Sequence, residues 1–222
     1  NPNQFQANVS YYAGYISAEL NPWNWVKAIV GVRAEKYRQR YTGRDITGDH
    51  QLNNTLVIND LDFFPTVNLI FPIAEKQNIR GSYSITIARP SFKEMSYAEI
   101  FDAISGRTFI GGLFRDANDL AGVEYWDGNL VTTSIQNFDL RYELFLNEGQ
   151  MVSLSGFYKS FEKPIELVQY FSQKDTYQPR NVGDGKVLGV EFELRKNLGF
   201  AGESVKNFIF TTNVTVTKSE IE

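Results

Sequence analysis

The chain of 222 residues contains no cysteine and a single histidine. Without thiols there are no disulfides and no thiolate metal ligands, and the lone His50 has no second histidine at a metal-ligand spacing. A glycine-rich phosphate loop and a serine nucleophile elbow are also missing. The sequence therefore predicts no catalytic residue, no metal site and no cofactor, and we do not expect an enzyme.

Long hydrophobic runs are absent as well. No segment approaches the roughly 20 consecutive apolar residues that a membrane-spanning helix requires. The formal net charge is -4, and a nucleic-acid partner is not expected because phosphate binding needs a clustered basic surface. A β-barrel escapes the hydrophobic-run test, since half of the residues in its strands face a wet lumen.

What the sequence does contain is a series of long strands with alternating apolar and polar residues. Short turns and long polar segments connect them in alternation, which is typical of an outer-membrane barrel. The prediction is an all-β fold, an antiparallel up-and-down meander of roughly eight long strands that is part of a transmembrane β-barrel. The strands are expected at 4–20, 24–42, 62–71, 78–89, 131–146, 150–161, 179–197 and 206–219, and the long outer loops at 43–60, 90–129 and 161–178.

Charge sorting within the strands predicts which face meets lipid. Successive side chains point to opposite faces, and a charge at the bilayer midplane costs roughly 2 to 4 kcal/mol. In the second strand the uncharged row runs from Val26 to Ala34, and a similar row runs from Phe138 to Leu146. In the first strand the row Phe5, Ala7, Val9, Tyr11, Ala13 and Tyr15 is expected on the lipid side. The charged residues predicted to face the lumen are Arg33, Glu35, Asp139, Arg141, Glu143, Glu191 and Glu193.

Alternation by itself does not require a membrane, because a soluble β-sandwich that serves as a binding module also has one apolar face. Strand length favours the membrane, since a tilted crossing strand needs about 9 to 11 residues. Aromatic residues also gather at the strand ends, as in interfacial girdles. A small autonomous outer-membrane barrel is a further alternative, and it requires that the first and last strands pair with each other.

The long segments are the candidate ligand-binding elements, because loops of such length are frequently functional. The segment 96–127 mixes aromatic and charged residues, and Tyr97 to Ile104 is expected to form a short helix within it. Together with 45–59 it is expected to form an external ligand mouth. The candidate ligand-binding residues are Arg107, Phe109, Phe114, Arg115, Tyr125 and Trp126.

Several short motifs resemble the barrel of TonB-dependent outer-membrane receptors, in particular the type with a carboxypeptidase-regulatory-like extension. The matching residues lie between Tyr83 and Glu222, while residues 1–75 match in pattern only. They are Arg89, Pro90, Ser91, Phe92, Glu94 and Met95; Gly128 to Leu130; Asn137 to Phe145; Gly156 to Lys159; Pro164 to Glu166; Asn181; Gly189 to Phe192; and Asn213, Thr215 and Ser219.

The resemblance implies a function that the spacing of residues does not. Family members are barrels of about 22 strands with a plugged lumen, located in the bacterial outer membrane. They bind a scarce nutrient from outside, such as a siderophore, a cobalamin or a glycan, and a TonB complex energises its import. The expected partners are thus the nutrient, the lipid bilayer, the receptor's own plug domain and the TonB complex. Because this chain shows no signal peptide, no plug and no barrel C-terminus, we expect it to be a fragment of the barrel wall.

Overall fold

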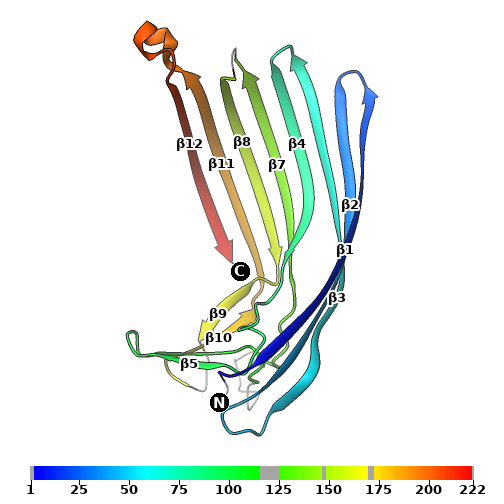
Figure 1. The fold of residues 1–222 in the computed structure, drawn as a ribbon, viewed down its shortest axis with the longest axis vertical. Helices are drawn as coiled ribbons and strands as arrows, with labels where there is room; N and C mark the ends of the chain where they lie inside the picture. The colour runs from blue at the N-terminus through cyan, green and yellow to red at the C-terminus, as the bar shows by residue number, and fades with distance from the viewer. Residues whose placement is uncertain (1–2, 116–125, 147–148, 170–172, 222) are drawn as a thin grey trace.

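Eight long antiparallel strands form one continuous sheet in the computed structural model, which describes residues 3–115, 126–146, 149–169 and 173–221 (Figure 1). Their order in the sheet follows their order in the chain, so the sheet is a meander. The strands are β1 (Gln6–Trp23), β2 (Val26–Arg44), β3 (Gln51–Ala74), β4 (Gln77–Ala88), β7 (Thr133–Phe145), β8 (Met151–Glu162), β11 (Asp184–Asn197) and β12 (Ile209–Ile221). The predicted all-β meander is confirmed.

The sheet curves into a wall with short turns at one end and long connections at the other (Figure 1). Two-residue turns join β1 to β2 at Asn24 and Trp25, and β3 to β4 at Glu75 and Lys76. The first turn was expected at residues 21–23, but β1 pairs with β2 through a register shift that extends it to Trp23. None of the helices in the described ranges is long and apolar enough to cross a membrane.

The prediction of a long loop at 43–60 is wrong. β3 is 24 residues long and begins at Gln51, so β2 and β3 continue as a hairpin well beyond the other strands. The Asp45 carboxylate closes the short connection, because it accepts hydrogen bonds from the amides of Gly48 at 2.5 Å and His50 at 3.2 Å. The segment is mostly polar, but the backbone hydrogen bonds that pair β2 with β3 do not depend on the polarity of the side chains.

A second sheet of four short strands lies at the end of the wall with the long connections (Figure 1). Its order is β5 (Glu99–Asp102), β6 (Arg107–Ile110), β10 (Thr176–Asn181) and β9 (Ile165–Gln169). The expected helix at Tyr97 to Ile104 is therefore wrong, because this segment enters the β5–β6 hairpin. The expected loop 161–178 contains β9, and the strand expected at 179–197 is divided between β10 and β11. We call residues 90–115, 126–132, 163–169 and 173–183 the outer lobe.

The buried hydrophobic core lies where the outer lobe meets the extension of β2 and β3. Tyr41 and Ile58 come from the wall, and they pack against residues of the lobe, namely Met95, Tyr97, Leu113 and Leu130. Tyr41 is fully buried, and its hydroxyl oxygen accepts a hydrogen bond from the amide of Tyr97 at 3.1 Å. Elsewhere the described part of the wall is one sheet thick and has no comparable cluster of buried residues, so the lobe depends on this contact for its position.

The strand register assigns every side chain of the wall to one of two faces. Phe138, Tyr158 and Leu188 stand side by side on one face, and so do Leu140, Gly156 and Val190 one step further along. We call this the apolar face. The expectation for the first strand is wrong, because Tyr11 pairs with Tyr37, which lies on the opposite face. In β1 the apolar face carries the even-numbered residues such as Ile16 and Leu20, which pair with Val32 and Ala28.

Two glycines of the wall differ in what a side chain would meet. A Cβ at Gly189 would lie 2.5 Å from the Phe157 ring and 2.7 Å from the Val216 carbonyl oxygen, whereas a Cβ at Gly81 would meet nothing within 4 Å. We expect Gly189→Ala to lower the free energy of unfolding by about 1 to 3 kcal/mol through overpacking, and Gly81→Ala to change it little. Urea titration of the refolded full-length receptor, followed by tryptophan fluorescence, measures both. Equal stability of the two variants would contradict the expectation.

Candidate functional site

Most charged side chains in the middle of the wall strands lie on the face opposite the apolar one. Register pairs Glu35 with Asp62 in the neighbouring strand, and Asp139 with Ser82. We call this the polar face. It carries all seven residues that the sequence assigns to the lumen, which are Arg33, Glu35, Asp139, Arg141, Glu143, Glu191 and Glu193. The core contact of Tyr41 and Ile58 with the outer lobe is made from this same face.

Arg89 is the centre of a charge network where the wall meets the outer lobe. It follows directly after β4, and its guanidinium contacts Glu35 at 3.1 Å and Asp62 at 2.6 Å. The same group lies 4.6 Å above the ring centre of Tyr37. The side chains of Arg89 and Glu35 are only 16% and 11% exposed. Arg89 thus connects β2 and β3 to the point where the chain leaves the wall after β4.

Arg33 and Tyr11 extend this network toward β1. Arg33 Nε lies 2.6 Å from a Glu35 carboxylate oxygen, and its Nη2 donates to the Tyr11 hydroxyl at 2.8 Å. The Tyr11 hydroxyl in turn donates to Glu35. Glu35 therefore receives three charged or polar donors from three different strands or connections. Such charge-assisted hydrogen bonds hold a carboxylate in one orientation.

A second network spans β4, β7 and β11 on the polar face. Glu143 accepts from Arg80 at 2.7 Å and from Arg141 at 3.1 Å. Arg141 also reaches Glu193 at 2.8 Å, although β8 lies between their strands. It reaches across because the β8 residues in the intervening positions, Ser153 and Ser155, are small. Arg141 thus links β7 to β11.

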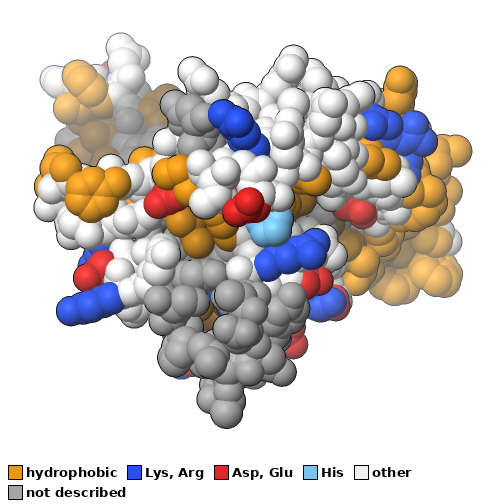
Figure 2. Space-filling model, turned by 90° about the horizontal axis from the view of Figure 1, so that it is seen from below, with side chains coloured by type: hydrophobic (Ala, Val, Ile, Leu, Met, Phe, Trp, Pro, Cys, Tyr) orange, Lys and Arg blue, Asp and Glu red, His pale blue; other side chains and the backbone are white. Residues whose placement is uncertain are grey.

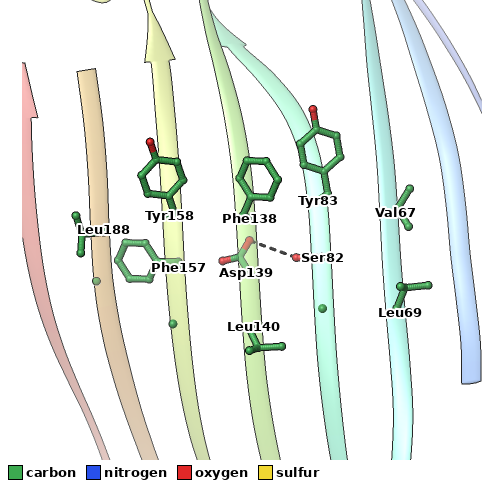
Figure 3. Close-up of a pocket in the computed structure, with 13 residues that line it drawn as sticks. Val67, Leu69, Ser82, Tyr83, Phe138, Asp139, Leu140, Phe157, Tyr158 and Leu188 are labelled. Atoms are coloured by element: carbon green, nitrogen blue, oxygen red, sulfur yellow. Dashed lines mark hydrogen bonds between the residues drawn. The ribbon is translucent and has the colours of Figure 1, made fainter. Parts of the chain in front are cut away.

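The remaining two predicted acidic residues have neutral partners. Asp139 accepts from the Ser82 hydroxyl at 3.2 Å (Figure 3). Glu191 accepts from the Asn213 side-chain amide at 2.5 Å. Lys27 pairs with Glu19 of β1 at 2.7 Å and not with the acidic residues of β7. The acidic residues that the sequence assigns to the lumen are therefore all hydrogen-bonded, either in one of the two charge networks or in a separate pair.

The candidate ligand-binding residues fall into two groups in the structure. Arg107 and Phe109 share one face of β6 with Tyr177 of β10, whose ring lies 5.2 Å from the Arg107 guanidinium and 6.0 Å from the Phe109 ring. Ile100 and Leu167 lie on the same sheet face, 41% and 58% exposed. This group is accessible, and Tyr177 is a member that the sequence did not single out, because only the parallel pairing of β6 with β10 brings it there.

The second group is built into the interior of the outer lobe. Phe114 packs edge-on against Tyr97 at 5.5 Å, and Trp126 Nε1 donates to the Gly112 carbonyl at 2.8 Å. Gln178, fully buried, donates to the carbonyls of Gly111 at 3.1 Å and Phe114 at 2.7 Å. Phe114 and Trp126 thus hold the lobe together. Arg115 is exposed at the edge of the described segment, and Tyr125 lies outside the described residues.

One carboxylate of the outer lobe has a shifted pKa. The Ser105 hydroxyl donates to Asp102 at 2.6 Å and the Ile104 amide donates at 3.0 Å. Both hydrogen bonds stabilise the ionised form, so they lower the pKa of Asp102. They also close the β5–β6 turn, and Asp102 is therefore best understood as a structural residue of this hairpin.

A cavity of about 460 Å³ lies at the junction of the wall and the outer lobe. Its charged residues include Arg89, Glu94 and Glu166, and Thr133 and Phe161 belong to the polar face of the wall. The volume lies within the range of about 300 to 1,000 Å³ for small-molecule pockets. Figure 2 shows the end of the molecule seen from below, where charged and polar side chains are interspersed over the surface.

A larger hollow of about 670 Å³ lies on the wall, where Gly81 and Gly156 flank Leu140. Tyr83, Phe138 and Tyr158 stand in a row above it, and the Phe157 ring turns from β8 toward β11 (Figure 3). It is open and lined mainly by apolar side chains, so it lacks the convergent polar groups that a ligand pocket uses. Within the described ranges there is also no group of three or more potential metal ligands.

Comparisons with known proteins identify the fold. A family model described as "TonB dependent receptor-like, beta-barrel" matches residues 1–220. The siderophore receptor PirA from Pseudomonas aeruginosa is similar in structure, with a TM-score of 0.62 and 14% sequence identity over 98% of this chain. The pyoverdine receptor FpvA from Pseudomonas aeruginosa PAO1 gives a TM-score of 0.65 with 16% identity over 100%. The alcaligin receptor FauA from Bordetella pertussis gives 0.60 with 12% identity over 98%.

The chain spans only part of these receptors. It covers 44% of the PirA chain, 27% of the FpvA chain and 31% of the FauA chain. No curated protein gives a significant sequence match. At such low identity the solved structures establish the fold, and the family match establishes the location of the chain in the bacterial outer membrane.

Proposed function

This chain belongs to the TonB-dependent receptor-like β-barrel family, and from that premise we propose that it forms part of the wall of a receptor that binds and imports a scarce nutrient. In this proposal the apolar face meets lipid and the polar face meets the lumen. The plug domain and the TonB complex of the full-length protein are its further partners. The family comprises receptors and transporters, and no catalytic role is proposed.

The observation that carries the proposal is the sorting of side chains over the central strands of the wall. The row Phe138, Tyr158 and Leu188 faces one side, while Arg141 and Glu193 form an ion pair on the other. A transmembrane barrel requires this arrangement, because charged groups are expensive on its lipid face and tolerated in its lumen. The outer lobe packs against the polar face, where it covers the lumen entrance.

Both alternatives to a barrel fragment conflict with the topology. β1 and β12 are the two edges of the sheet and do not pair with each other, so the chain does not close into a barrel of eight strands. A sandwich needs a second sheet across the apolar face. The only other sheet in the described part of the chain belongs to the outer lobe, which packs against the polar face.

We propose a metal chelate as the nutrient. The similar structures named above include a siderophore receptor, an alcaligin receptor and a receptor bound to pyoverdine. The accessible group Arg107, Phe109 and Tyr177 suits a chelate that carries both negative charge and flat ring surface, because a guanidinium binds anions and an aromatic face stacks on rings. Uptake of a cobalamin or a glycan in place of a chelate is the alternative result of the test described next.

The test is uptake by cells that produce the full-length receptor containing this chain. Radiolabelled ferric hydroxamate and ferric catecholate chelates, cobalamin and an oligosaccharide serve as probes. We expect uptake of a ferric chelate that disappears in cells without TonB. Surface-exposed receptor that imports none of the probes, or that imports one independently of TonB, would contradict the proposed function.

Within this receptor we expect the double variant Arg107→Ala/Phe109→Ala to bind the imported chelate about 10-fold to 100-fold more weakly, since anchor residues contribute about 1 to 3 kcal/mol. Ile104→Ala is the matched control, because Ile104 lies in the same hairpin and is 99% exposed. Binding is measured by quenching of intrinsic fluorescence on whole receptor in detergent. An unchanged affinity of the double variant would remove this group from the binding site.

A further inference from the structure

The apolar face of β2 continues outward into a row of positive charge. Beyond Ala34, the residues with the same orientation are Lys36, Arg38 and Arg40, because the β1–β2 register is unbroken between Tyr41 and Ala28. Successive members of the row are about 7 Å apart along the strand. We call these three residues the basic row.

No carboxylate neutralises the basic row within the described residues. Lys36 Nζ lies 3.5 Å from the Asn59 carbonyl oxygen, and Arg40 Nη1 donates to the Asn54 carbonyl at 2.8 Å. The nearest acidic residues in sequence on β3, Asp60 and Asp62, belong to the polar face. The cations therefore present most of their donors to the surroundings of the barrel.

Two lysines on the apolar face of β11 and β12 are, by contrast, paired with an acid. Lys186 of β11 lies 3.0 Å from a Glu220 carboxylate oxygen, and Lys218 of β12 contacts the same carboxylate. The two sides of the wall thus differ, because the basic row of β2 has no acidic partner among the described residues, whereas the lysines of β11 and β12 share a glutamate. A localised positive site results on the outside of β2.

The neighbours of the basic row complete a surface for a lipid headgroup. Asn8 and Ser10 of β1 lie opposite Arg40 and Arg38 and offer uncharged hydrogen-bonding groups. Tyr12 and Leu61 flank Lys36 and are 69% and 57% exposed, so apolar surface continues up to the first cation. The acyl chains of a lipid would therefore contact the apolar surface below Lys36, and the anionic headgroup attached to them would contact the basic row.

We propose that the basic row binds the phosphate groups of an anionic lipid in the outer leaflet of the outer membrane. The inference rests on the assignment of the apolar face to lipid that the proposed function makes. It does not depend on which nutrient the receptor imports. Arg38 and Arg40 supply planar forks of donors for phosphate oxygens, and Lys36 supplies a point charge closest to the acyl chains.

The test uses purified full-length receptor in neutral maltoside micelles and fluorescently labelled lipid A as the probe. We expect the variant Lys36→Gln/Arg38→Gln/Arg40→Gln to bind lipid A about 100-fold more weakly at low salt, and Arg38→Gln alone about 5-fold more weakly. Lys186→Gln/Lys218→Gln is the matched control on the same face and should change binding little. A charge-preserving variant, Arg38→Lys, should retain most of the affinity.

Equal lipid A binding by the triple variant and the parent receptor would overturn the proposal. Displacement of lipid A by millimolar inorganic phosphate would also overturn it, since the site would then recognise free phosphate. Chelate uptake by the triple variant in cells is measured in parallel. If the triple variant imports the chelate normally but no longer binds lipid A, the result supports the proposal. If the parent receptor itself imports no chelate, the proposed function fails, and the lipid-binding result is judged separately.

Discussion

Replacement of Arg89 by alanine should release the outer lobe from the wall. The change leaves Glu35 and Asp62 without the cation that bridges them at 3.1 and 2.6 Å. Removal of one partner from a largely buried ion pair costs about 3 kcal/mol or more. The remaining Arg33 contact with Glu35 moderates this cost, but Asp62 has no second cation in the described part of the chain.

The measurement is proteinase K cleavage of the full-length receptor on intact cells. A loss of about 3 kcal/mol in the local opening free energy predicts cleavage within the lobe that is about 100-fold faster. Arg89→Lys should give an intermediate rate, because an ammonium cannot hold both carboxylates with a planar fork. Lys93→Ala, an exposed position on the same connection, is the control. Equal cleavage of Arg89→Ala and parent receptor would show that Arg89 does not hold the lobe.

The second large effect is expected at Tyr41, which is fully buried at the same junction. Its ring lies 5.6 Å from that of Phe5 and 6.3 Å from that of Tyr97. Tyr41→Ala opens a cavity between wall and lobe, and truncation of a large buried aromatic residue costs about 3 to 5 kcal/mol. Tyr41→Phe keeps the ring and removes only the acceptor of the Tyr97 amide, which costs about 1 to 3 kcal/mol.

Hydrogen exchange on the full-length receptor distinguishes loss of the lobe from loss of the whole fold. The amides of Gly111 and Gly112 donate to the carbonyls of Ala98 and Glu94 at 2.8 and 2.6 Å, and we expect them to lose protection in Tyr41→Ala. Amides within β7 and β8 should keep theirs, because the wall pairing does not involve Tyr41. Ile46→Ala, exposed at the nearby hairpin turn, should match the parent receptor. If Tyr41→Ala does not insert into the membrane, Tyr41→Phe takes its place. We expect a smaller loss of protection at Gly111 and Gly112 in this variant, with unchanged protection in β7 and β8. Protection equal to that of the parent receptor throughout Tyr41→Phe would contradict a role of Tyr41 in holding the lobe.

The face of most strands was predictable because charge leaves little choice in lipid. Arg141 and Glu143 alternate with Leu140 and Tyr142, so one orientation places two charges in the bilayer and the other places none. β1 has no such guide between Phe5 and Tyr15, where uncharged residues occupy both faces. Its orientation came from the pairing of Tyr11 with Tyr37, a long-range contact that local pattern does not contain.

The outer end was the least predictable part of the chain. Segment 43–60 is mostly polar, and the β2–β3 pairing contains two register shifts in this region, so the extended strands left no regular alternation to detect. Aromatic composition marked Phe114 and Trp126 as binding residues, but composition does not distinguish a ligand contact from a lobe core. The partners of Arg89 were likewise hidden, since Glu35 is 54 residues away in the chain.

The sequence by itself determined the class of the fold, the number of wall strands and the side of each charged strand that avoids lipid. These features follow from the strong penalty on charge in hydrocarbon and from the two-residue period of a strand, both of which are local. Only the tertiary structure decided the orientation of β1, the grouping of Arg107, Phe109 and Tyr177, and the junction at Arg89 and Tyr41. Each of these depends on contacts between distant segments, whose energy is set by packing and register and leaves no periodic trace in the chain.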